Sequence, residues 1–113
     1  MVKYNYKIMK SVTNLEKTKG KKEGELKMPT ISMFYGILIQ MYNNNEHNPP
    51  HFHAIYGEYK AIFSLDGELL EGSFPKNQQK LIAAWAVLHI DELKANWELA
   101  INGESLYKIE PLK

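Results

Sequence analysis

The chain contains no cysteine and no arginine, and each absence removes a class of chemistry. Without cysteine the protein has no disulfide bridge, no thiolate metal ligand and no thiol nucleophile. Without arginine every basic side chain is a lysine, so the planar fork that binds phosphate through two hydrogen bonds is missing. No apolar run approaches the roughly 18 residues of a membrane span. We therefore expect a cytoplasmic protein with no membrane partner, and no motif indicates a cofactor.

The charge divides the chain into two parts. Residues 1–27 hold eight lysines against three glutamates, a balance of +5, and residues 28–113 hold six lysines against ten acids, a balance of −4; the two sum to the formal +1. The lysine run at 17–24 and the scarcity of apolar periodicity beyond Tyr4, Tyr6, Ile8 and Met9 predict a flexible basic extension over 1–27. A basic arm that contacts nucleic acid or an acidic partner is the alternative. Residues 28–113 are long enough for a single domain with one core.

Strand and turn signals follow from residue 31 onward. Residues 31–42 are nearly continuous in β-branched and aromatic residues, which predicts one long strand bent at Gly36. Gly57-Glu58 has the glycine that a type II′ hairpin turn needs, and Asp66-Gly67 is a type I′ signal. These turns predict three further strands.

Two-residue turns fix the pairing of the strands that they join. The predicted pairs are Tyr56–Tyr59, Ala54–Ala61 and Phe52–Phe63 across the first turn, and Ser64–Leu69, Phe63–Leu70 and Ile62–Glu71 across the second. Because side chains alternate between the faces of a sheet, one face becomes an apolar core face. The opposite, half-polar face is predicted to carry His51, His53, Ile55, Lys60, Ile62, Ser64, Leu69 and Glu71.

Helical signals close the chain. Pro75 suits a first helical turn, and apolar residues at helical spacing follow it over 81–88. Asp91 is a plausible N-cap for a second helix, which is expected to stop at Asn102-Gly103. Ser105 to Pro111 is expected to be extended and to pair with a sheet edge. The prediction is an α+β fold: a four-stranded antiparallel β-meander, two helices and a short C-terminal extended segment.

Three of the four histidines lie within seven residues, at His47, His51 and His53. His51 and His53 share one face of a strand, and imidazole, with an ordinary pKa of about 6.5, suits general acid and base catalysis. Lys60 could stabilise a phosphorane-like charge, as in a metal-independent ribonuclease, and Glu71 lies in the same cross-strand row. The candidate catalytic residues are therefore His51, His53, Lys60 and Glu71.

Other readings of the same stretch stay open. Candidate binding residues around it are His47, Ser64 and Tyr42. A metal site with Glu46 or Glu71 as an added ligand is conceivable, but the spacing matches no standard zinc pattern, so no metal ligand is assigned. For any one histidine, local packing and hydrogen bonding is the simplest interpretation, and His89 is interpreted as structural, near a helix end.

Several motifs in order carry a family resemblance. They are Pro29-Thr30-Ile31-Ser32-Met33-Phe34-Tyr35-Gly36-Ile37, Pro50-His51-Phe52-His53-Ala54, Gly67-Glu68-Leu69-Leu70-Glu71-Gly72, Trp85-Ala86-Val87-Leu88-His89 and Lys108-Ile109-Glu110-Pro111-Leu112. With them the chain resembles, from Met28 to Lys113, a small bacterial family of domains of unknown function, some of whose members are described as toxins of type II toxin–antitoxin pairs. Members typically begin at the sequence Met-Pro-Thr-Ile-Ser, which makes residues 1–27 an extension outside the resemblance. Gln40 stands where an arginine is usual.

The resemblance implies a cytoplasmic protein with a cognate small protein as its partner. The leading hypothesis is a toxin-like component of a two-gene module that binds this partner, with RNA as a second candidate target. A non-enzymatic adaptor domain, docking a partner on its polar sheet face or on an edge strand, is the alternative from another class. A small metal-binding domain is the third hypothesis, and a homodimer is a candidate assembly.

Overall fold

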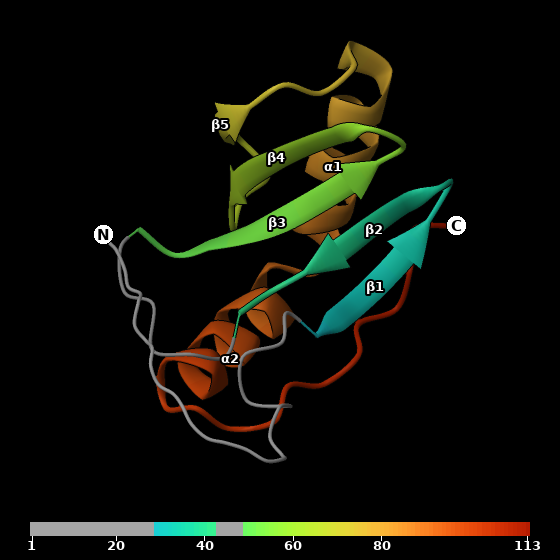
Figure 1. Ribbon diagram of the computed structural model, residues 1–113. Coiled ribbons are helices and arrows are strands. Elements are labelled where there is room, and N and C mark those ends of the chain that lie inside the picture. The colour runs from blue at the N-terminus through green and yellow to red at the C-terminus, as the bar shows by residue number, and fades with distance from the viewer. Residues whose placement is uncertain (1–28, 43–48) are drawn as a thin grey trace.

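A five-stranded antiparallel sheet and two helices make up the fold (Figure 1). The structure is a computed structural model that describes residues 29–42 and 49–113. In chain order the elements are β1 (Thr30–Phe34), β2 (Ile37–Gln40), β3 (His51–Tyr56), β4 (Tyr59–Ser64), β5 (Leu69–Gly72), α1 (Lys76–Leu88) and α2 (Ile90–Ile101). Each strand pairs with its neighbours in sequence. The predicted α+β class is confirmed, and the extension predicted over 1–27 lies outside the described residues.

The prediction of four strands is wrong, because the long strand expected over 31–42 is a hairpin. Tyr35 and Gly36 have φ angles of 50° and 79°, and positive values at both central positions define a type I′ turn. The chain therefore folds back, and Phe34 pairs with Ile37. A tyrosine with positive φ is uncommon, and it lies inside a nearly continuous apolar run. No residue there except the glycine signalled a turn.

The β3–β4 hairpin has the predicted register. Its partners include Phe52 with Phe63 and His53 with Ile62, and Gly57 has the positive φ, 59°, that the turn requires. The two-residue turn left no freedom in the pairing, so the division of side chains between the two faces follows directly from the sequence.

The β4–β5 pairing is only partly as predicted. Ile62 pairs with Glu71, as expected. Phe63, however, pairs with Leu69 and not with Leu70, because a bulge between Ile62 and Phe63 shifts the register by one residue. The predicted pairing of Ser64 with Leu69 is wrong for the same reason.

The turn before β5 explains the shift. The Gly67 amide donates to the Ser64 carbonyl over 2.9 Å, and the Ser64 amide donates to the Glu68 carbonyl over 2.8 Å. The connection therefore has three residues, with Gly67 at a φ of 90°, and not the two expected. A Cβ on Gly67 would also lie 2.8 Å from the Cα of Ala83 in α1, so glycine is needed both for the turn and for close packing of the helix.

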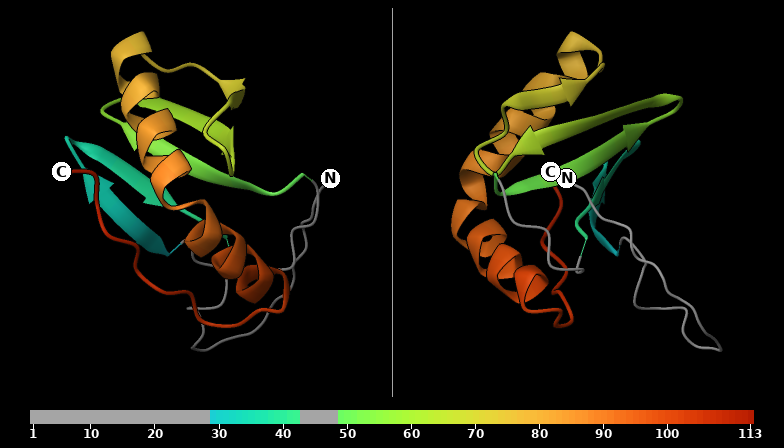
Figure 2. Two further views of the ribbon diagram at one scale, coloured as in Figure 1. Left: turned by 180° about the vertical axis from the view of Figure 1, so that it is seen from behind. Right: turned by 60° about the vertical axis from the view of Figure 1, so that its left-hand side comes forward.

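Helix α1 covers one face of the sheet, and the core lies between them (Figure 2). Trp85 is fully buried at its centre, with ring centroids 5.3 Å from Phe34 and 5.7 Å from Phe52. Residues from four strands and both helices also belong to this core, among them Ile31, Ile37, Ile39, Ala54, Ala61, Phe63, Ile82 and Leu93. Neither described helix is long and apolar enough to cross a membrane.

The two helices are separated by one residue, His89. It serves as the C-cap of α1 and the N-cap of α2, with a φ of −120°. The prediction that Asp91 caps the second helix is therefore wrong by two residues, because the chain kinks at His89 without an intervening loop. Asp91 and Glu92 lie in the first turn of α2, where the positive end of the helix dipole stabilises negatively charged side chains.

Residues 104–113, here called the C-terminal strap, run back along β1. The buried Asn96 side chain donates to the Tyr107 carbonyl over 2.8 Å and accepts from the Tyr107 amide over 3.0 Å. The Trp85 indole donates to the Glu110 carbonyl over 2.8 Å. The Ile109 amide donates to the Ile31 carbonyl over 2.7 Å. The strap thus pairs with β1 through one backbone hydrogen bond and is anchored by two side chains from the helices.

Candidate functional site

The sheet face turned away from α1, here called the outer face, carries two cross-strand rows. They follow from the observed pairs: Gln40, His53, Ile62 and Glu71 in one row, and Met33, Leu38, Ile55 and Lys60 in the other. No described helix lies over this face (Figure 1). Four of the eight side chains are apolar, although a solvated sheet face normally alternates to polar residues. The outer face is therefore the candidate binding surface.

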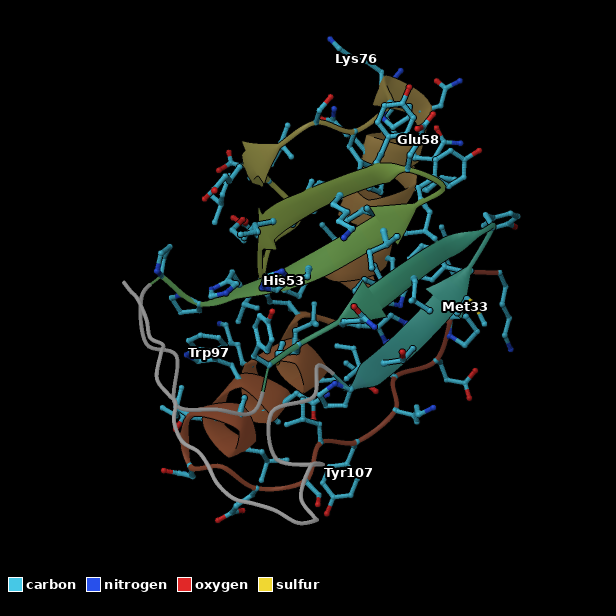
Figure 3. All side chains as sticks on the ribbon, viewed as in Figure 1. Met33, His53, Glu58, Lys76, Trp97 and Tyr107 are labelled. Atoms are coloured by element: carbon cyan, nitrogen blue, oxygen red, sulfur yellow. The ribbon has the colours of Figure 1, made fainter. Side chains whose placement is uncertain are left out.

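A shallow depression of about 250 Å³ lies on the outer face over β3, β4 and β5. Its walls include His53, Ile55, Lys60, Ile62 and Glu71. Lys60 and Glu71 are exposed, whereas the other three are half-buried. The depression thus places an imidazole, an ammonium group and a carboxylate around an apolar floor. Figure 3 shows the imidazole, His53, on β3. The ammonium group of Lys60 can bind a negative charge, and the carboxylate of Glu71 can bind a positive one. The imidazole of His53 can donate or accept a proton.

His51 lies at the start of β3 and is more buried than its neighbour on the same face. Only 9% of its surface is exposed. Its Nδ1 lies 2.7 Å from the Pro49 carbonyl oxygen, and its ring centroid is 5.3 Å from that of Trp97 in α2. The last β2–β3 pair is Gln40 with His53, so His51 extends beyond β2, toward α2. Of the two strand histidines, His53 borders the depression and His51 does not.

His53 is surrounded by aromatic rings on its own face. Its centroid lies 4.8 Å from Tyr42, with the rings nearly perpendicular, and 5.3 Å from His51. The sequence-predicted pair of imidazoles is therefore adjacent, and Tyr42, a predicted binding residue, contacts it. Ring contacts therefore run without a break along this end of the sheet, in the order Tyr42, His53, His51 and Trp97.

The other predicted binding residues lie elsewhere. The Ser64 hydroxyl donates to the Asp66 carboxylate and accepts from the Glu68 amide over 3.1 Å. It therefore stabilises the β4–β5 turn, and it does not line the depression. His47 and Glu46 lie outside the described residues.

Within residues 29–42 and 49–113, no three histidine, aspartate or glutamate side chains lie close enough together to hold a metal ion. The fourth histidine, His89, occupies the helix junction, where its Nδ1 lies 2.5 Å from a carboxylate oxygen of Glu92 and its ring contacts Trp85. This arrangement fits the structural role predicted for His89.

Three of the eight outer-face residues were not predicted from the sequence. Met33, Leu38 and Gln40 belong to its two rows. The prediction of a single long strand over 31–42 did not say on which face of the sheet these side chains lie. Gly36 was the only turn signal in this stretch of the sequence, because a positive φ at a tyrosine such as Tyr35 is not expected from its residue type. Once that turn is known, the pairing of β2 with β3 extends both rows to β1 and β2.

Comparison with known proteins identifies one family. The model of the family described as Domain of unknown function (DUF4160) matches residues 36–98. The match covers every outer-face residue except Met33, and it runs from the β1–β2 turn through most of α2. Neither the comparison with curated proteins nor that with solved structures gives a match.

Proposed function

Because the chain belongs to the DUF4160 family of domains of unknown function, we propose that it is the toxin-like half of a two-gene module and binds its cognate small protein on the outer face. The observation that carries this proposal is the composition of that face. Leu38, Ile55 and Ile62 form a half-buried apolar strip across three strands. Lys60 and Glu71 flank it with opposite charges. Apolar patches rimmed by charge are typical of protein-binding surfaces.

The flat shape also favours a protein over a small molecule. The depression is shallow and open, whereas small ligands are usually enclosed over most of their surface. The folded part, residues 28–113, has a net charge of −4 and no arginine, which is unfavourable for binding a phosphate backbone. A partner protein that covers the strip would remove Ile55 and Ile62 from water and pair with both flanking charges.

Induced expression in bacteria, with and without the small protein encoded next to the gene, tests the proposal. We expect growth arrest that the neighbouring protein relieves. Ile62→Asp should weaken relief and raise the Kd for the partner at least tenfold, about 1.4 kcal/mol, because a carboxylate would be buried against the partner. Val87→Asp is the matched control, since Val87 is 66% exposed on α1, which covers the opposite face. Unimpaired growth, or an equal effect of both substitutions, would contradict the proposal.

Action on RNA is the second candidate function, and one observation favours it. His53, Lys60 and Glu71 line one depression, so a proton-transfer group lies beside a cation that could stabilise phosphorane charge. If the arrest depends on cleavage, His53→Ala should abolish it while partner binding persists. His51→Ala should retain arrest, because His51 is directed toward Trp97. Arrest that survives His53→Ala would exclude this chemistry at the depression.

A further inference from the structure

Strand β5 is a bare edge of the sheet, and this distinguishes it from the opposite edge. All four of its residues are exposed, including Leu69 at 38% and Leu70 at 44%. Within the described residues it pairs with β4 alone, whereas β1 at the other edge is paired with the strap at Ile31. Exposed backbone donors and acceptors beside apolar side chains form a template for another strand.

The charge around β5 selects the kind of strand that would fit. Asp66, Glu68 and Glu71 are exposed in and just before it. Two copies of β5 pairing edge to edge would bring both sets of three acids to one seam, and like charges on adjacent strands are destabilising. Its bulge and its length of four residues also disfavour long, flat partners. The edge therefore favours a short, basic, alternating strand over a second copy of itself.

The chain itself contains such a sequence. Between Val2 and Ile8 apolar residues alternate strictly with polar ones: Val2, Tyr4, Tyr6 and Ile8 against Lys3, Asn5 and Lys7. Strict alternation over seven residues with aromatic and β-branched side chains is a strand pattern. We propose that residues 2–8 add to β5 as a sixth strand of the sheet, in cis.

The observed β4–β5 register indicates which sheet face the apolar and the lysine side chains of residues 2–8 would share with side chains of β5. Leu69 pairs with the core residue Phe63, and Glu71 pairs with the outer-face residue Ile62. A strand beside β5 with its tyrosines on the side of Leu69 carries Lys3 and Lys7 on the side of Glu71. Apolar contacts and opposite charges are then satisfied together.

The tether is long enough for this docking. The 20 residues from 9 to 28 span up to about 65 Å when extended, and five strands spaced by about 4.8 Å are only about 19 Å across. A short tether also keeps the local concentration of the segment in the millimolar range, so a modest intrinsic affinity suffices. This proposal goes beyond the partner binding proposed for the outer face and does not depend on it.

Cross-linking in the full-length chain tests the proposal, because the absence of cysteine makes every introduced pair unique. Tyr6→Cys is combined with Leu69→Cys on β5, or with one of two exposed control positions, Val87→Cys on α1 and Tyr107→Cys on the strap. We expect the β5 pair to form an intramolecular disulfide at least tenfold faster than either control pair. Equal rates would indicate an undirected tether, and cross-links only between two molecules would indicate a second copy; either result overturns docking in cis.

A charge exchange separates specific pairing from a general effect of the mutations. Lys7→Glu in the β5 cysteine pair should slow cross-linking several-fold, and adding Glu71→Lys should restore the rate. Slowing without restoration would contradict the predicted side of the strand on which the lysines lie.

Discussion

The two edge strands of the sheet, β1 and β5, differ in what covers them. At β1 the strap supplies a backbone hydrogen bond to Ile31 and is held by Asn96 and Trp85, two buried side chains of the helices. At β5 no described segment lies alongside, and the strand is short, bulged and acidic. The β1 edge is covered through tertiary packing. The β5 edge is uncovered among the described residues, and only its short length, its bulge and its acidic side chains disfavour pairing with other strands. Closure of β1 is thus part of the fold, while β5 remains available for binding.

The largest expected effect comes from releasing the strap. Asn96→Ala truncates a buried side chain and removes both of its hydrogen bonds to the Tyr107 backbone, which should lower the free energy of unfolding by about 2–4 kcal/mol. Asn102→Ala, at an exposed position after the same helix, is the control and should cost under roughly 0.5 kcal/mol. Denaturant unfolding measures both. Similar values for the two variants would mean that the strap does not stabilise the β1 edge.

Detaching β5 should cost less. Gly72 has a φ of 96°, and a Cβ there would lie 2.5 Å from the Lys60 carbonyl oxygen in β4. Gly72→Ala should therefore destabilise by about 2 kcal/mol, limited by the ability of an edge strand to fray. Gly103→Ala meets the same unfavourable φ, 71°, but no neighbouring atom within 4 Å. Hydrogen exchange should show lost protection confined to β4 and β5 for Gly72→Ala, and protection lost throughout the sheet would refute independent fraying of this edge.

The smallest effect is expected at the exposed side chains of β5. Leu70→Lys should change the free energy of unfolding by under roughly 0.5 kcal/mol, since Leu70 is 44% exposed. Ile109→Lys on the strap, where the side chain is 4% exposed, should cost about 2–3 kcal/mol because the polar end of the lysine would be buried or would displace the strap. Thermal unfolding of the two variants compares the edges directly. An equal loss of stability in both variants would contradict the distinction between a covered β1 edge and an uncovered β5 edge.

Local chemistry predicted some parts of this molecule and not others. The register of β3 and β4 follows from Gly57 alone, because a two-residue turn permits one pairing. The β1–β2 hairpin did not follow, since Tyr35 adopts a conformation that its residue type rarely takes. Asn96 gave no signal either: its partner Tyr107 lies 11 residues away, and a buried amide on a helix cannot be told from an exposed one by spacing alone.

The candidate site shows the same division. His53, Lys60 and Glu71 were predicted to share a face from alternation and register, and they line one depression. The separation of His51 from that depression depends on Trp97 of α2, a contact across the tertiary structure that no local pattern encodes. Leu38 and Gln40 joined the outer face only when the Tyr35-Gly36 turn fixed the position of β2.

The most direct test of partner binding on the outer face is chemical-shift mapping of the isotope-labelled full-length chain during titration with its cognate small protein. We predict that the largest perturbations fall on β2, β3 and β4, at Leu38, Ile55 and Ile62, with little change on the exposed side of α1 around Val87. Perturbations centred on α1 or on the strap, with the outer face unchanged, would contradict binding at this surface.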